Sequence, residues 1–136
     1  MLNIVLPIAG RGSRFADAGY SLPKPLIPVH GQPMIAAVVR NIRPSVPHRF
    51  IFVALAEHLE HRGMRDALEA AAPGAIVVPV SQVTEGAACT VLLAREFIDS
   101  PDPLMLANSD QWVDLDIDAY LAAMETARAD GLIMTM

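Results

Sequence analysis

Short apolar runs alternate along the chain with stretches in which apolar residues recur at helical spacing. The runs have the length and composition of buried strands, and the stretches between them fit helices. We predict strands at residues 2–6, 50–55, 75–80 and 103–107, and the start of a fifth at 132–136. We predict helices beginning at Pro33, spanning 57–71 and 86–97, and running from an N-cap at Asp116 to a closing Gly131.

This alternation predicts an α/β fold, a Rossmann-like, mostly parallel sheet with helices on both faces in three α/β/α layers. In such folds the loops at the carboxyl ends of the strands form the ligand site. Residues 8–32 are expected to form a long loop, and a loop of that length in a compact domain is usually functional. The 136 residues suffice for one domain, and because the last predicted strand meets the chain end, we expect a C-terminal part to be missing.

Composition and charge narrow the function classes. The chain is 53% hydrophobic with a net charge of −5, which argues against a general nucleic-acid or membrane-surface binder. No apolar run approaches the roughly 18 residues of a membrane span, and the N-terminus has no basic segment typical of a signal peptide. Cys89 is the single cysteine, so no internal disulfide is expected, and we predict that it is a small buried residue. These features favour a cytoplasmic protein.

A glycine-rich segment follows the first strand directly, with the sequence Ala9-Gly10-Arg11-Gly12-Ser13-Arg14-Phe15. Glycines let a backbone approach a ligand closely and turn its amides toward an anion. Arg11 and Arg14 add donors suited to phosphate oxygens. The simpler alternative is a tight turn with two solvated arginines.

Lys24 is the single lysine beside nine arginines, and it stands between Pro23 and Pro25. A lone lysine on a stiff segment indicates a need for a compact point charge, and the alternative is a surface lysine in a proline-rich turn. Asp110 follows the fourth strand, where ligands bind in this architecture. It could hold Mg²⁺ together with substrate phosphates, or it could belong to an Asx-turn.

A further polar segment follows the third strand. Gln82 carries a donor and an acceptor, enough to read the edge of a nucleobase, and Gly86 leaves room for a flat base. The alternative is a plain helix start with Thr84 as the cap. His58 and His61 lie one helical turn apart, and we predict that they belong to a solvated helix face.

Taken together, these segments resemble the sugar-phosphate nucleotidyltransferase family. The resemblance rests on the glycine segment from Gly10 to Phe15, then on Pro23-Lys24-Pro25-Leu26-Ile27-Pro28-Val29, then on Gly31-Gln32-Pro33-Met34-Ile35. It implies that the loop from Ala9 through Gly10, Arg11, Gly12 and Ser13 wraps a triphosphate, with Arg14 on the phosphates and Lys24 at the reacting phosphate. It places Gln82 and Gly86 at the base and Asp110 at the metal, Mg²⁺.

The sequence departs from the family pattern at two places. Pro7-Ile8 precede Ala9-Gly10 where relatives often have Leu-Ala, and Ser109 precedes Asp110 where many have glycine. Both departures leave the nucleotide preference open. The sugar-phosphate site of the family normally lies beyond the point at which this chain ends.

The resemblance implies an enzyme that transfers a nucleoside monophosphate from a nucleoside triphosphate to a sugar 1-phosphate or similar small phosphate, in nucleotide-sugar and surface polysaccharide biosynthesis. Two alternatives stay open: a non-catalytic nucleotide-binding or regulatory module, and a glycosyltransferase of related fold. A dinucleotide-binding domain is disfavoured, because Phe15 stands where the third glycine is needed. The expected partners are the triphosphate and a phosphorylated acceptor, with no nucleic acid and no membrane. An exposed sheet edge leads us to expect that the chain forms homo-oligomers or is marginally stable.

Overall fold

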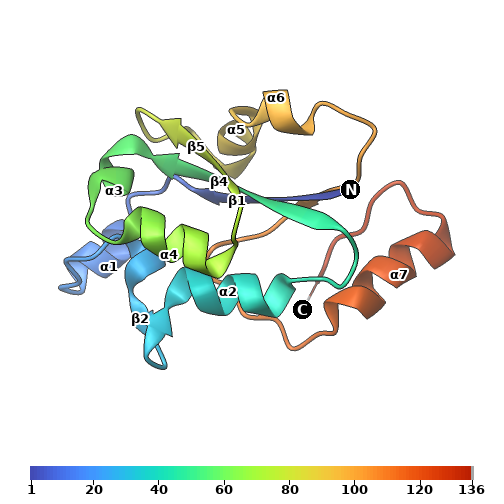
Figure 1. Ribbon diagram of the computed structural model, residues 1–136, viewed down its shortest axis with the longest axis horizontal. Coiled ribbons are helices and arrows are strands. Elements are labelled where there is room, and N and C mark those ends of the chain that lie inside the picture. The colour runs from blue at the N-terminus through green and yellow to red at the C-terminus, as the bar shows by residue number, and fades with distance from the viewer. Residues whose placement is uncertain (136) are drawn as a thin grey trace.

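The computed structural model describes residues 1–135 as strands that alternate with helices (Figure 1). In chain order the elements are β1 (Leu2–Ile8), α1 (Ser13–Asp17), the 3-10 helix η1 (Lys24–Leu26), β2 (Pro28–Val29), β3 (Gln32–Pro33), α2 (Met34–Ile42), β4 (His48–Leu55), α3 (Ala56–Glu60), α4 (Met64–Ala71), β5 (Ile76–Val80), α5 (Ala87–Leu92), α6 (Arg95–Ile98), β6 (Leu104–Leu106) and α7 (Ile117–Ala127). Among these residues no helix has the length and apolar character needed to cross a membrane.

The main sheet within residues 1–135 has four strands in the order β5–β4–β1–β6, all parallel. β1 pairs with β4 over its full length and with β6 over residues 3–5. A small antiparallel pair, β2 and β3, stands apart from this sheet. The predicted α/β fold with a mostly parallel sheet is therefore confirmed.

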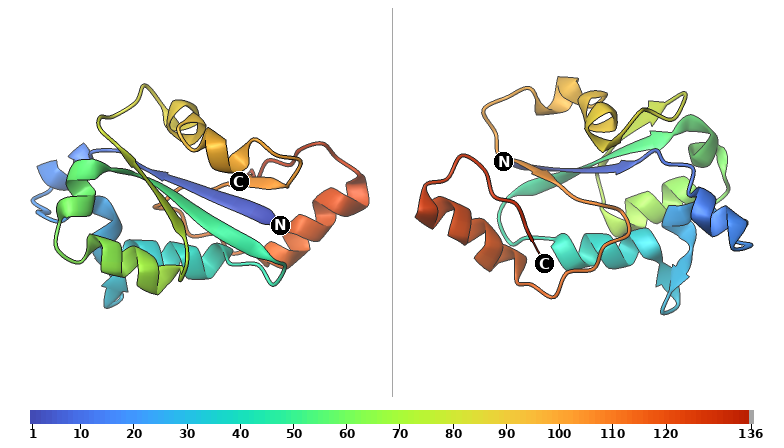
Figure 2. Two further views of the ribbon diagram at one scale, coloured as in Figure 1. Left: turned by 45° about the horizontal axis from the view of Figure 1, so that its top comes forward. Right: turned by 180° about the vertical axis from the view of Figure 1, so that it is seen from behind.

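Both faces of the sheet are covered, because alternate residues of a strand point to opposite sides. Ile4 and Leu6 of β1 are fully buried in a core that they share with Met64 of α4 and with residues of α2. Val5 points to the other face and packs in a second core with Val91 of α5. Figures 1 and 2 show α2 and α4 on one side of the sheet and α5 and α6 on the other, so the three predicted layers are confirmed.

Two predicted helices are each divided in the structure. The helix expected over 57–71 is interrupted between α3 and α4, where His61 is extended and Gly63 has a φ of +85°, and neither conformation can continue a helix. The helix expected over 86–97 is split into α5 and α6 by a tighter turn, in which Ala94 N–H donates to Val91 O. Ala94 is fully buried in the second core, so packing, not a breaker residue, sets this turn.

The C-terminal region differs from the prediction beyond α7. Asp116 is the N-cap as expected, since its carboxylate accepts from the N–H groups of Asp118 and Ala119. The helix nevertheless ends at Ala127, because Arg128 takes the left-handed conformation expected of Gly131. The predicted fifth strand is wrong for residues 132–135, which form no strand, and Met136 lies outside the described residues. Apolar composition makes a segment suitable for a strand, but a strand also needs a neighbouring strand to pair with.

The order of the strands creates a switch point in the sheet. From β1 the chain adds β4 and then β5 on one side, and then returns to place β6 on the other side of β1. Loops that leave neighbouring strands in opposite directions open a crevice at the carboxyl ends of those strands. The crevice between β1 and β6 is therefore the place where this fold accommodates a ligand.

Candidate functional site

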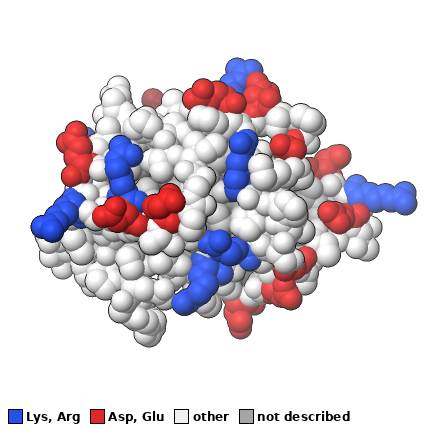
Figure 3. Space-filling view, viewed as in Figure 1, with Lys and Arg blue, Asp and Glu red and all other residues white. Residues whose placement is uncertain are grey.

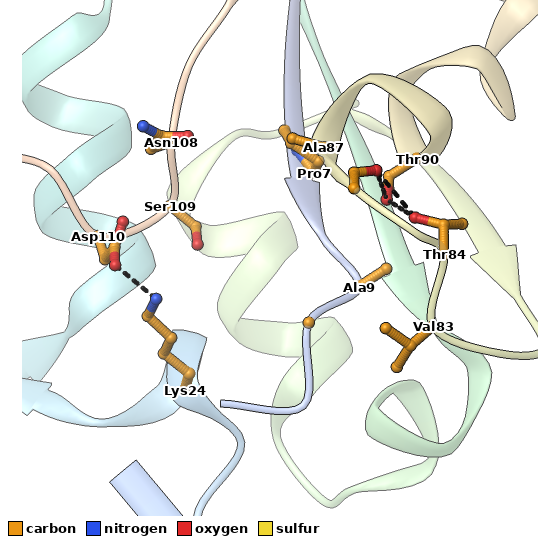
Figure 4. Close-up of a pocket in the computed structure, with 12 residues that line it drawn as sticks. Pro7, Ala9, Lys24, Val83, Thr84, Ala87, Thr90, Asn108, Ser109 and Asp110 are labelled. Carbon is orange, nitrogen blue, oxygen red and sulfur yellow. Dashed lines mark hydrogen bonds and ion pairs between the residues drawn. The ribbon is translucent and has the colours of Figure 1, made fainter. Parts of the chain in front are cut away.

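A pocket of about 250 Å³ lies at the carboxyl ends of β1 and β6 (Figure 4). Four segments line it: the end of β1 with the residues that follow it, the start of η1, the loop before α5 together with the first turn of α5, and the residues after β6. The lining residues are Pro7, Ala9, Gly10, Lys24, Val83, Thr84, Gly86, Ala87, Thr90, Asn108, Ser109 and Asp110. The fold thus brings five of the residues singled out in the sequence to one cavity: Ala9, Gly10, Lys24, Gly86 and Asp110.

The glycine loop passes close to Lys24. Gly12 has a φ of +62°, a left-handed conformation that favours glycine, and α1 begins directly after it. A Cβ on Gly12 would lie 3.2 Å from the Cβ of Lys24, tighter than an ordinary contact. The lack of a side chain at Gly12 therefore allows the glycine loop and the lysine segment to meet. The loop predicted over 8–32 contains α1, η1 and β2 as short elements.

The other predicted loop residues do not line this pocket. Arg11, Ser13 and Arg14 are exposed, and α1 buries none of its residues. Neither arginine forms an ion pair within residues 1–135. Neither guanidinium group therefore belongs to the lining of the cavity, and on the face shown in Figure 3 the basic side chains are interspersed with acidic ones.

Lys24 and Asp110 join two walls of the pocket. The Nζ atom of Lys24 lies 2.5 Å from Oδ2 of Asp110, and the side chains are 23% and 41% exposed. Such a partly exposed pair stabilises a fold only slightly, so its main consequence is that it holds the two side chains at one place in the pocket. The ammonium also lies 5.4 Å from the centre of the Phe15 ring, a cation–π contact. Buried Pro25 and the η1 turn hold the backbone beneath it.

The segment that carries Asp110 is fixed from both sides. Ser109 is buried, and the side-chain amide of Asn108 donates to Gln111 Oε1 at 2.8 Å. Farther along, Asn41 of α2 exchanges two hydrogen bonds with the backbone of Val113. The carboxylate is thus presented from a held segment at the end of β6.

The third wall differs from the one expected. Gly86 lines the pocket, whereas Gln82 is exposed and is not among the lining residues. The polar groups on this wall are instead the hydroxyls of Thr84 and Thr90, which lie 2.5 Å apart (Figure 4). Thr90 stands four residues after Gly86, on the same face of α5. The four-residue spacing is visible in the sequence. It predicts no site by itself, because threonines in helices often serve only as caps or as hydrogen-bond donors to the carbonyl four residues earlier.

No group of three or more histidine, cysteine, aspartate or glutamate side chains in residues 1–135 is arranged to hold a metal ion. Asp110 is the carboxylate among the pocket-lining residues. Its hard oxygens fit Mg²⁺, which in proteins commonly takes one or two carboxylates and completes its shell with water and substrate phosphates.

The sequence profile of the family described as Nucleotidyl transferase matches residues 3–136. The chain belongs to this nucleotidyl transferase family.

Solved structures give the same fold for this family member. The chain superposes on UDP-glucose pyrophosphorylase from Acinetobacter baumannii, and on a UTP-bound form of it, with a TM-score of 0.70 over 95% of this chain and 54% of theirs, at 21% and 22% identity. A nucleotidyl transferase from Methanothermobacter matches with a TM-score of 0.63 at 26% identity, over 82% of this chain and 51% of that one.

A curated relative matches a shorter stretch of the sequence. The bifunctional protein GlmU of Chromobacterium violaceum is 44% identical over 52 residues, which are 38% of this chain and 11% of GlmU. The chain therefore spans about half the length of the solved structures and a small part of this relative.

Two sequence predictions about this family member need correction. Cys89 is exposed on α5, because it points away from the second core that Val91 joins. His58 is half-buried, not fully solvated, and its Nδ1 atom is buried without a hydrogen-bond partner in the described structure. Burial lowers the pKa of His58 below 6.5; Glu57 opposes this shift, and the charges of His61 and Arg11 add to it. The position of α3 after β4 thus brings His58 within electrostatic reach of the glycine loop.

Proposed function

We propose that this chain is the nucleotide-binding part of an enzyme that transfers a nucleoside monophosphate from a nucleoside triphosphate to a sugar 1-phosphate or similar small phosphate. The observation that carries the proposal is the meeting of Lys24 and Asp110 at the switch-point pocket. Family membership and the UTP-bound relative support a triphosphate as the ligand. The half-length coverage of the relatives supports an acceptor site outside residues 1–136.

The reaction needs alignment and charge stabilisation, not a protein nucleophile. An oxygen of the acceptor phosphate attacks the α-phosphorus in line. The new P–O bond forms as the bond to the bridging oxygen of the β-phosphate breaks, and pyrophosphate leaves with that electron pair. Within this chain Lys24 supplies a compact positive charge at the pocket wall, and the exposed Arg14 and Arg11 of the glycine loop supply further donors for the phosphates.

The Lys24–Asp110 ion pair exchanges partners when the triphosphate binds. The ammonium turns from the carboxylate to the phosphate oxygens, which carry more negative charge, and the carboxylate becomes available to Mg²⁺. Mg²⁺ held there supplies positive charge that neutralises the phosphates. Asp110 holds the lysine in this structure and would be the residue that holds Mg²⁺ once the triphosphate is bound.

The proposal is tested by calorimetric titration of residues 1–136 with ATP, CTP, GTP, UTP and dTTP, with and without Mg²⁺. We expect Mg²⁺-dependent binding of at least one triphosphate. Lys24→Ala and Arg14→Ala should each weaken it by about tenfold or more, on the scale of one charge-assisted contact. Asp110→Ala should remove the dependence on Mg²⁺. An unchanged affinity in Arg14→Ala would contradict the role given to the glycine loop.

A pyrophosphate-release assay with a panel of sugar 1-phosphates and small phosphorylated alcohols addresses turnover. We expect the chain alone to stay at background, and robust acceptor-dependent release would place the acceptor site inside residues 1–136. Detection of a covalent nucleotidyl-enzyme would contradict direct attack. The non-catalytic alternative predicts nucleotide binding that is independent of Mg²⁺ and of Asp110, so that result would favour it.

A further inference from the structure

Two threonine hydroxyls and one carbonyl oxygen form a closed cluster in the pocket wall opposite Lys24 and Asp110 (Figure 4). The Oγ1 atoms of Thr84 and Thr90 lie 2.5 Å apart. Both also lie within hydrogen-bond distance of the Gly86 carbonyl oxygen, at 3.0 Å and 3.2 Å. Thr90 is 6% exposed and Thr84 is half-buried, so the cluster is a fixed part of the wall.

A count of hydrogens shows what this cluster presents to the pocket. The Gly86 carbonyl already accepts the Thr90 N–H at 3.0 Å, and a carbonyl oxygen has two lone pairs. It can therefore accept from one of the two hydroxyls, and the other hydroxyl must donate across the 2.5 Å contact between them. Whichever hydroxyl bonds the carbonyl, both hydroxyl hydrogens are used inside the cluster. Lone pairs alone remain for a ligand.

We propose that the Thr84–Thr90 pair is an acceptor-only subsite that takes a hydrogen-bond donor of the bound nucleoside, either a base N–H or a ribose O–H. The inference rests on the proposed function, which supplies the nucleotide. Phosphate oxygens are themselves acceptors, so they are disfavoured at the threonines and drawn to Lys24 on the opposite wall. The two walls together fix the direction of the nucleotide, with its phosphates at Lys24 and its nucleoside at the threonines.

A purely structural role makes a different prediction. Thr90 bonds the carbonyl four residues before it, as helical threonines often do, and Thr84 precedes the start of α5. If the hydroxyls served only α5, their removal would change stability and would affect all nucleotides alike. A subsite for a nucleoside donor instead makes the effect depend on whether the ligand carries that donor.

The test compares the wild-type chain with Thr84→Val, Thr84→Ser and the control Thr126→Val, which removes an exposed threonine on α7. Dissociation constants are measured with Mg²⁺ for the tightest-binding triphosphate, its 2′-deoxy and 3′-deoxy forms, and an analogue methylated at the base N–H. We expect Thr84→Val to bind the parent nucleotide about three- to tenfold more weakly, the scale of one neutral hydrogen bond. Thr84→Ser should restore the affinity, and Thr126→Val should leave it unchanged.

One analogue should bind the wild type about three- to tenfold more weakly and show no further loss in Thr84→Val. If it is a deoxy form, the donor is the ribose; if it is the methylated form, the donor is the base. The inference is overturned if Thr84→Val loses the same affinity for every analogue, or loses none. In that case nucleotide binding by the wild type still supports the proposed function. The wild-type series alone suffices if Thr84→Val does not fold, because three analogues that bind as tightly as the parent also overturn it. Failure of the wild type to bind any triphosphate contradicts the proposed function itself.

Discussion

The side-chain amide of Asn41 holds the backbone of Val113 through two hydrogen bonds. Its Nδ2 donates to the Val113 carbonyl and its Oδ1 accepts from the Val113 N–H, both at 2.9 Å. Asn41 belongs to α2, beneath the sheet, and Val113 lies three residues after Asp110. Helix α2 therefore fixes the segment that carries the carboxylate, although it contributes no residue to the pocket lining.

Asn41→Ala should lower the free energy of unfolding by about 1–3 kcal/mol, because it leaves a part-buried N–H and carbonyl without partners. It should also weaken triphosphate binding, since Asp110 loses its anchor. Urea unfolding and calorimetric titration measure the two effects. The neighbouring Arg40→Ala, which removes an exposed 3.5 Å contact with Gln32, is the matched control and should change stability by less than about 0.5 kcal/mol. Equal stabilities of the two variants would contradict the anchoring role.

Gly12→Ala should be more harmful than Gly10→Ala. A Cβ on Gly12 meets a φ of +62° and the Lys24 Cβ at 3.2 Å, whereas a Cβ on Gly10 has no heavy atom within 4 Å. We expect Gly12→Ala to cost about 1–2 kcal/mol of stability through its left-handed backbone, and to displace Lys24. Gly10→Ala should be close to neutral in the same urea titration. The reverse order would show that the loop adjusts freely.

His58 should make the fold sensitive to mild acid. Burial lowers its pKa in the folded state, with Glu57 opposing the shift and the charges of His61 and Arg11 adding to it. The unfolded chain therefore binds the proton more tightly, and stability falls as the pH drops below 6.5. His58→Gln should reduce this acid-dependent loss in urea titrations at several pH values. His61→Gln removes only one of the charges that add to the shift, so it should reduce the acid-dependent loss less than His58→Gln does. A profile unchanged by His58→Gln would exclude this residue as the source.

The outer edge of β6 should drive self-association. β6 is a terminal strand of the sheet within residues 1–135, and its Leu104 and Leu106 side chains are 45% and 55% exposed. Unpaired apolar edges tend to pair with another chain. Light scattering after gel filtration should show a concentration-dependent mass above 14.6 kDa, and Leu106→Lys should shift it toward the monomer. Leu92→Lys adds the same charge at an exposed position of α5, away from the edge, and should leave the association unchanged. A monomeric wild type at all concentrations would contradict the prediction.

The sequence predicted the fold better than the walls of the pocket. The apolar run from Phe50 to Leu55 lies within a central strand as expected, because a continuous run of that length is buried on both sides in a parallel sheet. The run from Leu132 looked similar, yet residues 132–135 form no strand. Strand formation needs a neighbour to pair with, and sequence composition does not report one.

The pocket residues also differ in how far the sequence predicts them. Lys24 and Asp110 were singled out from their residue types and positions in the sequence, and the structure joins them across 86 residues. The sequence predicts Thr84 only as a possible helix cap and gives Thr90 no role, because a hydroxyl acquires a directional role only from the groups beside it. Gln82 has the richer side chain but lies outside the pocket lining, since the turn of the chain between β5 and α5 decides which residue faces inward.

The position of β6 at the far side of β1 also has a consequence for biosynthesis. As the chain leaves the ribosome, β1, β4 and β5 are complete by Val80 and can assemble before Leu104 has been made. A nascent chain at that stage has three strands of the main sheet, the glycine loop and Lys24, but not the aspartate that holds the lysine. Under the proposed function, a nucleotide can therefore stabilise the fold through both Lys24 and Asp110 only after residue 110 has emerged.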